Sequence, residues 1–301
     1  MFQTDRPPRR FLDPAVVARL GTLELKARTI VEGFLSGLHR SPFKGFSVEF
    51  AEYRQYIPGD DLATIDWKVY ARSDRYYVKK FEEETNLDCH VMLDVSGSMG
   101  YGSGAMTKFE YAACLAASLG YLMTRQRDAV GLMAFSDRVV SLLPASGRPG
   151  HLRSMLVTLN RLTLGKQTDV SKPLNQLCDA LTKRGMVVLI SDLLDDPEAV
   201  VRGLKQFQFR GCDVLVFHVL DPYELEFPFD RATRFEDLET DEEVMAVPDV
   251  VRSHYLREIR GLIDRYKREL GAAGIDYTLL PTSQPLELAL LSYLSTRSKA
   301  L

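Results

Sequence analysis

One short apolar stretch of the sequence ends in a carboxylate that two hydroxyls follow at two-residue spacing. The stretch 89–95 (CHVMLDV) carries Asp94 near its end, and Ser96 and Ser98 come next. A short apolar run of this kind predicts a buried strand, and ligands of open α/β sheets bind at the carboxyl ends of strands. Three oxygen donors with one negative charge suit Mg²⁺, which prefers oxygen ligands and usually keeps water. The sequence therefore predicts a Mg²⁺ site, with Mn²⁺ or Ca²⁺ as substitutes, whose cation retains positive charge for an external carboxylate.

Two later positions offer further oxygen donors. Thr168 stands just before a predicted helix, and Asp192 directly follows the apolar stretch 186–191 (MVVLIS), another predicted strand. Structural interpretations remain open for all five residues. The first three could cap the following turn, Thr168 could be a helix N-cap, and Asp192 could be a loop acid.

The order of these residues along the chain resembles the metal-ion-dependent adhesion site of von Willebrand factor A domains. That order is D-x-S-x-S, then T-D, then an acid at the end of a strand. The resemblance implies that the serines and the threonine bind the cation directly or through water, and that the two acids often act through water. We expect Asp94, Ser96, Ser98, Thr168 and Asp192 to converge at an exposed edge of the sheet, where the site can be altered without disturbing the fold.

The elements that must position these residues alternate between strands and helices from residue 88 onward. This alternation predicts an α/β fold, von Willebrand factor A-like or Rossmann-like, with a mainly parallel sheet covered by helices on both faces. The predicted strands are 89–95, 128–135, 138–143, 186–191, 212–220 and 275–280, and the predicted helices are 108–125, 151–162, 170–183, 197–207, 249–271 and 285–297.

The segment upstream of the alternating region carries three motifs. An E-F-x-x-x-R-x-Y-x-P-G-D-D block spans 49–61, I-D-W-K spans 65–68, and K-x-F-E-E-E spans 79–84. Together they resemble the signature of the domain-of-unknown-function-58 family, in which they precede a von Willebrand factor A module. Many relatives begin with transmembrane helices that this sequence lacks. Members tend to be encoded beside MoxR-type AAA+ ATPases, which implies partnership with such an ATPase. The motifs could also be purely structural.

We divide the chain into three parts. Residues 1–45 form a basic helical segment with a net charge of +4, residues 46–85 form a β-rich module, and residues 86–301 form the α/β domain. Trp67 lies in an alternating stretch of the β-rich module, so we expect it to be buried.

An acidic excursion at 221–250 interrupts the alternation of strands and helices. It contains eleven acidic and two basic residues, for a net charge of −9, and predicts a hairpin that turns near 239–241. Acidic runs usually face water, so one interpretation is a solvated surface segment. The other is a docking surface for a basic partner.

The overall composition excludes several classes of protein. The 301 residues are 46% hydrophobic and 26% charged, with a net charge of −3, as in ordinary globular proteins, and no basic field indicates nucleic-acid binding. Four scattered cysteines predict reduced thiols and a cytoplasmic protein. Neither C-x-x-C nor H-x-x-x-H occurs, so no zinc site is expected. No signal peptide or bilayer-length apolar stretch is present, so we expect no direct membrane insertion.

Enzyme signatures are incomplete. The glycine-rich loop 97–104 could bind phosphate, but Ser103 stands where a P-loop requires lysine. A serine hydrolase would need glycine at the position of Asp94. We therefore predict a non-enzymatic, Mg²⁺-dependent interaction module that serves as an adaptor or co-chaperone of a MoxR-type AAA+ ATPase toward an unknown client protein. The alternatives are a metal-dependent phosphoester hydrolase and a metal-independent scaffold.

Overall fold

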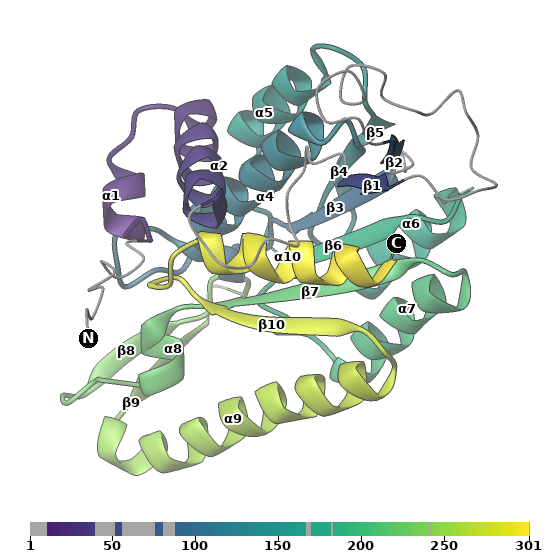
Figure 1. Ribbon diagram of the computed structural model, residues 1–301. Coiled ribbons are helices and arrows are strands. Elements are labelled where there is room, and N and C mark those ends of the chain that lie inside the picture. The colour runs from purple at the N-terminus through teal and green to yellow at the C-terminus, as the bar shows by residue number, and fades with distance from the viewer. Residues whose placement is uncertain are drawn as a thin grey trace, which may run out of the picture.

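A six-stranded sheet forms the centre of the protein (Figure 1). The computed structural model describes residues 11–39, 52–55, 76–80, 88–166, 170–181, 183–240 and 242–300. The strands of the sheet, in spatial order, are β10 (Asp276–Pro281), β7 (Asp213–Leu220), β6 (Met186–Ser191), β3 (Asp88–Asp94), β4 (Ala129–Phe135) and β5 (Val139–Ser146). All neighbouring strands are parallel except β4 and β5, which pair antiparallel at one edge. The predicted α/β fold with a mainly parallel sheet is confirmed.

Helices cover both faces of this sheet (Figure 1). On one face lie α4 (Lys108–Arg125) and α10 (Glu287–Ala300), with α2 (Leu23–His39) and α5 (His151–Arg161) packed against α4. On the other face lie α6 (Ser171–Ala180), α7 (Pro197–Phe209) and α9 (Pro248–Ala272).

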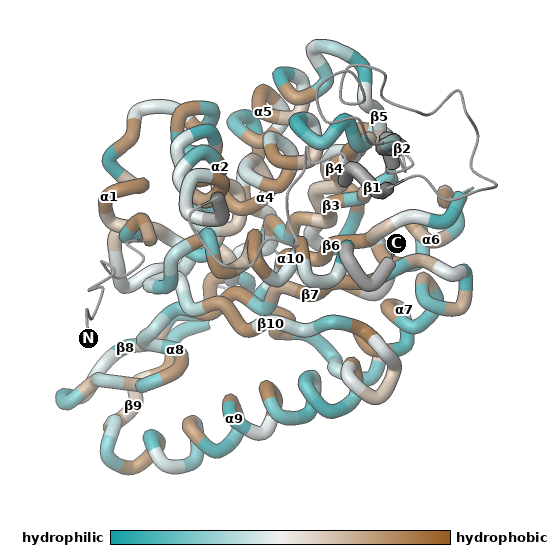
Figure 2. The backbone as a smooth tube through the Cα atoms, in the orientation of Figure 1, coloured by the Kyte–Doolittle hydropathy of each residue, from teal (hydrophilic) through white to brown (hydrophobic). Residues whose placement is uncertain are grey.

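Alternate residues of each central strand feed two separate cores, because successive side chains of a strand point to opposite faces. In β3, Val91 and Leu93 belong to the core under α4, whereas Met92 belongs to the core under α7. All three are fully buried. The central strands are accordingly the most hydrophobic part of the trace, whereas α9 is largely hydrophilic (Figure 2).

The N-terminal helices pack directly on the α/β domain. The short α1 (Pro14–Ala18) is capped by the side chain of Asp13, and α2 buries Ile30, Val31 and Phe34 against α4. The amide of Leu12 donates a hydrogen bond to Glu287 of α10 at 2.8 Å. These helices therefore share the core of the domain.

Two short strands are described from the β-rich segment, β1 (Glu52–Gln55) and β2 (Tyr77–Lys80), which pair antiparallel. Trp67 and the rest of that segment lie outside the described residues, so the expected burial of Trp67 stays a prediction. None of the helices among the described residues is long and apolar enough to cross a membrane.

The acidic excursion between β7 and α9 contains a short helix, α8 (Pro222–Glu226), and an antiparallel hairpin of β8 (Thr233–Glu236) and β9 (Glu243–Ala246). Phe227 stacks on Phe235 at 5.6 Å and lies 4.8 Å from Tyr255 of α9, measured between ring centroids. Phe229 contacts both phenylalanines. The excursion is therefore a packed unit with an aromatic core of its own.

Candidate functional site

The loop after β3 brings the three residues of the D-x-S-x-S pattern together. Asp94 is the last residue of β3, and the chain then enters a short 3-10 helix, η3 (Gly97–Gly100). The amide of Ser96 donates to Asp94 Oδ1 at 2.9 Å, and the Oγ atoms of Ser96 and Ser98 lie 3.1 Å apart. Two adjacent octahedral ligands of Mg²⁺, each about 2.0–2.1 Å from the metal, lie about 3 Å from each other. The two hydroxyls therefore have the spacing of a cation-binding pair.

The neighbouring strand β6 contributes a donor to the same carboxylate. The hydroxyl of Ser191 donates a hydrogen bond to Asp94 Oδ2 at 2.6 Å and accepts one from the backbone amide of Leu193 at 2.9 Å. Asp94 is fully buried, and within the described residues it has no lysine or arginine as an ion-pair partner. Burial and the nearby charge of Asp192 raise the pKa of Asp94 to about 7, although the hydrogen bonds from Ser191 and Ser96 favour its charged form.

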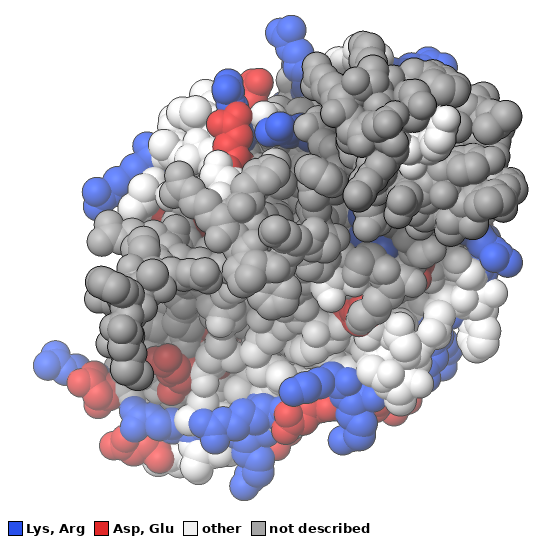
Figure 3. Space-filling view, viewed as in Figure 1, with Lys and Arg blue, Asp and Glu red and all other residues white. Residues whose placement is uncertain are grey.

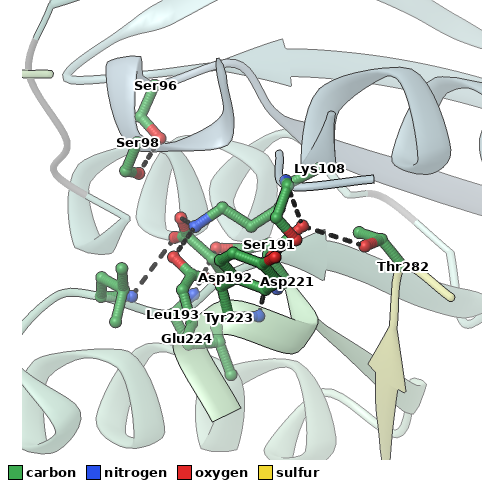
Figure 4. A network of polar contacts seen from close by, with 12 residues as sticks. Ser96, Ser98, Lys108, Ser191, Asp192, Leu193, Asp221, Tyr223, Glu224 and Thr282 are labelled. Atoms are coloured by element: carbon green, nitrogen blue, oxygen red, sulfur yellow. Dashed lines mark hydrogen bonds and ion pairs between the residues drawn. The ribbon is translucent and has the colours of Figure 1, made fainter. Parts of the chain in front are cut away.

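Asp192 has a partner of a different kind, the buried lysine at the start of α4. Lys108 Nζ lies 2.7 Å from Asp192 Oδ2 and 2.6 Å from Glu224 Oε1 of α8 (Figure 4). Lys108 and Asp192 are fully buried, and the Glu224 side chain is 16% exposed. The ammonium thus joins α4, the loop after β6 and the acidic excursion, three segments far apart in the sequence.

The position of Lys108 is costly for a cation. It is the first residue of α4, where the helix dipole disfavours positive charge. It directly follows the N-cap Thr107, which forms a capping box with Glu110. Burial alone would lower the pKa of Lys108, but the charges of Asp192 and Glu224 outweigh burial and raise it. The carboxylates of Asp192 and Glu224 therefore keep Lys108 charged in spite of its burial.

The described residues on either side of Thr168 are attached to the loops after β3 and β6. The amide of Gly165 donates to the carbonyl of Val95 at 2.7 Å, and the amide of Val170 donates to Asp195 Oδ2 at 2.8 Å. Both flanks are thereby attached to the loops after β3 and β6. Thr168 itself lies outside the described residues, so its part in the site stays a prediction.

The expectation of an exposed site is wrong. Asp94, Ser96 and Asp192 are 0% exposed, Gly97 is buried, and Ser98 is partly buried. The cover comes from the acidic excursion and the loop at Gly165. A Cβ on Gly97 would lie 2.5 Å from the carbonyl oxygen of Leu238 in the hairpin turn and 3.2 Å from that of Gly165. Sequence reasoning placed the site at the edge of the sheet but had no signal for the segment that folds over it.

Comparisons with known proteins agree with this architecture. The family described as "Protein of unknown function DUF58" matches residues 52–261. Uncharacterized proteins of Mycobacterium tuberculosis and Mycobacterium bovis are 31% identical over 219 residues, which cover 72% of this chain and 68% of theirs. This chain belongs to the DUF58 family.

Among solved structures, the conserved hypothetical protein BatB from Bacteroides thetaiotaomicron aligns with a TM-score of 0.50 at 17% identity, over 71% of this DUF58 chain and 98% of BatB. The VWA domain of SpRpn10 aligns over 72% of this chain and 97% of its own, with a TM-score of 0.39 and 14% identity. The predicted family and the predicted α/β fold are confirmed.

The donor set of this DUF58 protein fits a hard divalent cation. Among the described residues no cluster of three or more His, Cys, Asp or Glu could hold a metal, so a cation here would depend largely on hydroxyl oxygens. Lys108 pairs with Asp192 and Glu224, whereas the buried Asp94 has no cationic partner among the described residues. A cation held by Asp94, Ser96 and Ser98 would balance the excess negative charge.

Lys108, Ser191, Asp221 and Glu224 are the residues of this site that sequence reasoning missed. Asp221 accepts the amide of Ser103 at 2.8 Å and also the Ser103 hydroxyl. The glycine-rich loop is therefore tied down by a carboxylate. A Cβ on Gly102 would lie 2.7 Å from Thr107 Cα, so glycine there permits close backbone packing. The glycine at position 102 therefore has a structural cause apart from phosphate binding.

Proposed function

We propose that this DUF58 protein is a non-enzymatic, Mg²⁺-dependent interaction module that captures a carboxylate of a partner protein. The observation that supports the proposal most is the 3.1 Å separation of the Ser96 and Ser98 hydroxyl oxygens beside the buried carboxylate of Asp94. Oxygen donors at that spacing suit octahedral Mg²⁺. The family and the fold shared with BatB support an interaction module and assign no class of enzyme.

Each residue has a distinct part in this proposal. Asp94, Ser96 and Ser98 would hold the cation, and Thr168 joins them through the resemblance to adhesion sites. Asp192 is held in an ion pair with Lys108, and it would act on the cation from one side of the site. When bound, the cation would supply a Lewis-acidic position at which an external carboxylate replaces water. Ser191 orients Asp94 by donating a hydrogen bond to it.

The proposed partner is a MoxR-type AAA+ ATPase, with this chain serving as its adaptor or co-chaperone toward a client protein in the cytoplasm. The support comes from the family itself, whose members tend to be encoded beside such ATPases. A carboxylate that reaches the cation could belong to either the ATPase or the client. The charge of the acidic excursion offers a second, metal-free mode of docking that an experiment must separate from the first.

Binding of the purified ATPase to immobilised protein tests the proposal at two salt concentrations, each with and without EDTA. We expect EDTA and Ser98→Ala each to weaken binding strongly, because both remove the cation. Ser154→Ala, on the exposed side of α5, is the matched control and should bind as wild type does. Exposed charge pairs are screened within a Debye length of about 8 Å at physiological salt. EDTA-insensitive binding that collapses with salt would refute the metal bridge, and Mg²⁺-dependent turnover of a phosphoester would refute the non-enzymatic assignment.

A further inference from the structure

The acidic excursion touches the candidate metal site at three points. Near its start, Asp221 binds Ser103 of the glycine-rich loop. In its helix, Glu224 binds Lys108 at 2.6 Å. In the hairpin turn, the carbonyl of Leu238 packs directly on Gly97, where even a Cβ would collide. The segment that the sequence presents as an acidic interruption therefore forms a wall of the site.

These contacts control access to the cation ligands. Asp94 and Ser96 have no exposed surface, and Ser98 is only partly exposed. A partner carboxylate that is to bind beside these oxygens must come within about 2–3 Å of the same cation. In the described arrangement the excursion stands in that approach, so it has to move before a partner can bind.

The excursion has the construction of a movable unit. Its hairpin is a separate two-stranded sheet, and such sheets are marginally stable without further packing. Val244 and Met245 of β9 are 60% and 74% exposed, so this strand has little packing on either of its faces. The aromatic contacts of Phe227, Phe229 and Phe235 hold α8 and the hairpin together as one body.

One residue connects this body to the metal site. Lys108 binds Asp192 beside the site and Glu224 in the excursion with a single ammonium group. Glu224 in turn accepts the amide of Asp221 through its other oxygen at 2.7 Å, which fixes α8 relative to Lys108. A change in the charge around Asp192 therefore alters the attraction between Glu224 and the Lys108 ammonium that both carboxylates share.

We propose that residues 222–247 form a lid that is closed over the metal site, with the Lys108–Glu224 ion pair as its latch and the Leu238–Gly97 contact as its seal. The lid opens to admit a partner carboxylate, and it competes with the partner for the approach to the cation. The proposal rests on the proposed function for the identity of the partner group. The lid itself is testable without any metal.

Two variants open the lid in different ways. Gly97→Ala places a methyl group against the Leu238 carbonyl and breaks the seal, and the backbone of Gly97 has no positive φ that alanine would strain. Glu224→Gln removes the charge of the latch while keeping its shape, and it lies outside the loop that holds the cation. Gly104→Ala is the matched control, because a Cβ on Gly104 meets nothing within 4 Å.

Hydrogen exchange of the metal-free proteins measures the lid directly. We expect the amides of Met99 in η3 and Tyr101 just after it, and those of the hairpin, to exchange about tenfold faster or more in Gly97→Ala and Glu224→Gln, because local opening exposes them. Gly104→Ala should match wild type. Wild-type exchange rates in both lid variants would overturn the lid.

Loading with Mn²⁺ then separates the lid from the function. Water-proton relaxation per bound Mn²⁺ should be higher in both lid variants, because bulk water reaches the ion more freely. Equal relaxation in wild type and both lid variants would overturn the claim that the lid closes the metal site. Failure of every protein to bind Mn²⁺, together with faster exchange in the lid variants only, would overturn the proposed function and leave the lid standing as a cover of the loop after β3.

Discussion

Asp94 and Asp192 lie at the ends of neighbouring parallel strands and are equally buried, but their surroundings differ in kind. Asp94 receives neutral donors, the Ser191 hydroxyl and the Ser96 amide, whereas Asp192 receives the ammonium of Lys108. The negative charge of Asp192 in the loop after β6 is thus balanced by the Lys108 ammonium of the chain itself. The loop after β3 keeps a buried carboxylate that has no cationic partner among the described residues, beside the hydrogen-bonded hydroxyls of Ser96 and Ser98, and this difference supports our proposal of a cation there.

The largest effect should come from removing the charge that balances Asp192. Lys108→Met keeps the length of the side chain but leaves Asp192 and Glu224 as uncompensated buried carboxylates. Breaking a buried ion pair by removing one partner costs about 3–5 kcal/mol. Urea denaturation should show a loss of that order in the free energy of unfolding.

Lys267→Met is the control for that measurement, because Lys267 is exposed on α9. Substitutions at such surface positions change stability by about 0.5 kcal/mol or less. Figure 3 shows acidic and basic side chains mixed along the edge of the molecule where α9 runs, so a single charge there has little weight. Equal stability of Lys108→Met and Lys267→Met would contradict the ion-pair network.

A smaller effect should separate the two aspartates themselves. Asp192→Asn removes one of two charged hydrogen bonds to Lys108, which costs about 1.5–3 kcal/mol. Asp94→Asn removes a charge that has no cationic partner among the described residues, so we expect a change below about 1 kcal/mol, the value of an ordinary neutral hydrogen bond. Chemical denaturation in EDTA makes the comparison. Equal losses would mean that the two carboxylates are balanced alike.

An effect close to that of Asp192→Asn should come from the hydroxyl that links the two loops. Ser191→Ala removes the hydrogen bond to Asp94 Oδ2 and leaves the amide of Leu193 without that acceptor. Each such loss costs about 1 kcal/mol. Thermal unfolding in EDTA should place this variant near Asp192→Asn in stability and below Asp94→Asn. A destabilisation as large as that of Lys108→Met would show that Ser191 carries more of the network than its hydrogen bonds explain.

The sequence predicts the fold and the loop after β3 well, because both depend on local patterns. Short apolar runs identify β3 and β6, and the i, i+2, i+4 spacing of Asp94, Ser96 and Ser98 lies within one turn of chain. The hairpin of the acidic excursion and the bounds of the helix after it also follow from local composition, and the structure places both close to the expected residues, whereas the short α8 was not predicted.

The remainder depends on contacts between distant segments. Lys108, Asp192 and Glu224 are separated by more than thirty residues each, and no periodicity marks a lysine at a helix start as buried. The three phenylalanines inside the acidic excursion were the available signal that this segment forms a packed core rather than a solvated loop. Reading Phe227, Phe229 and Phe235 as a core would have predicted a packed lid instead of a solvated loop.

Calorimetric titration of Mg²⁺ into wild-type protein and Asp94→Asn tests the central claim most directly. Because Asp94→Asn should retain the stability of the fold, its binding isotherm reports on the site alone. The account predicts saturable binding of one Mg²⁺ per chain in wild type and none in Asp94→Asn, with Mn²⁺ following the same pattern. Equal binding by the two proteins, or no binding by wild type, would contradict a cation site at the end of β3.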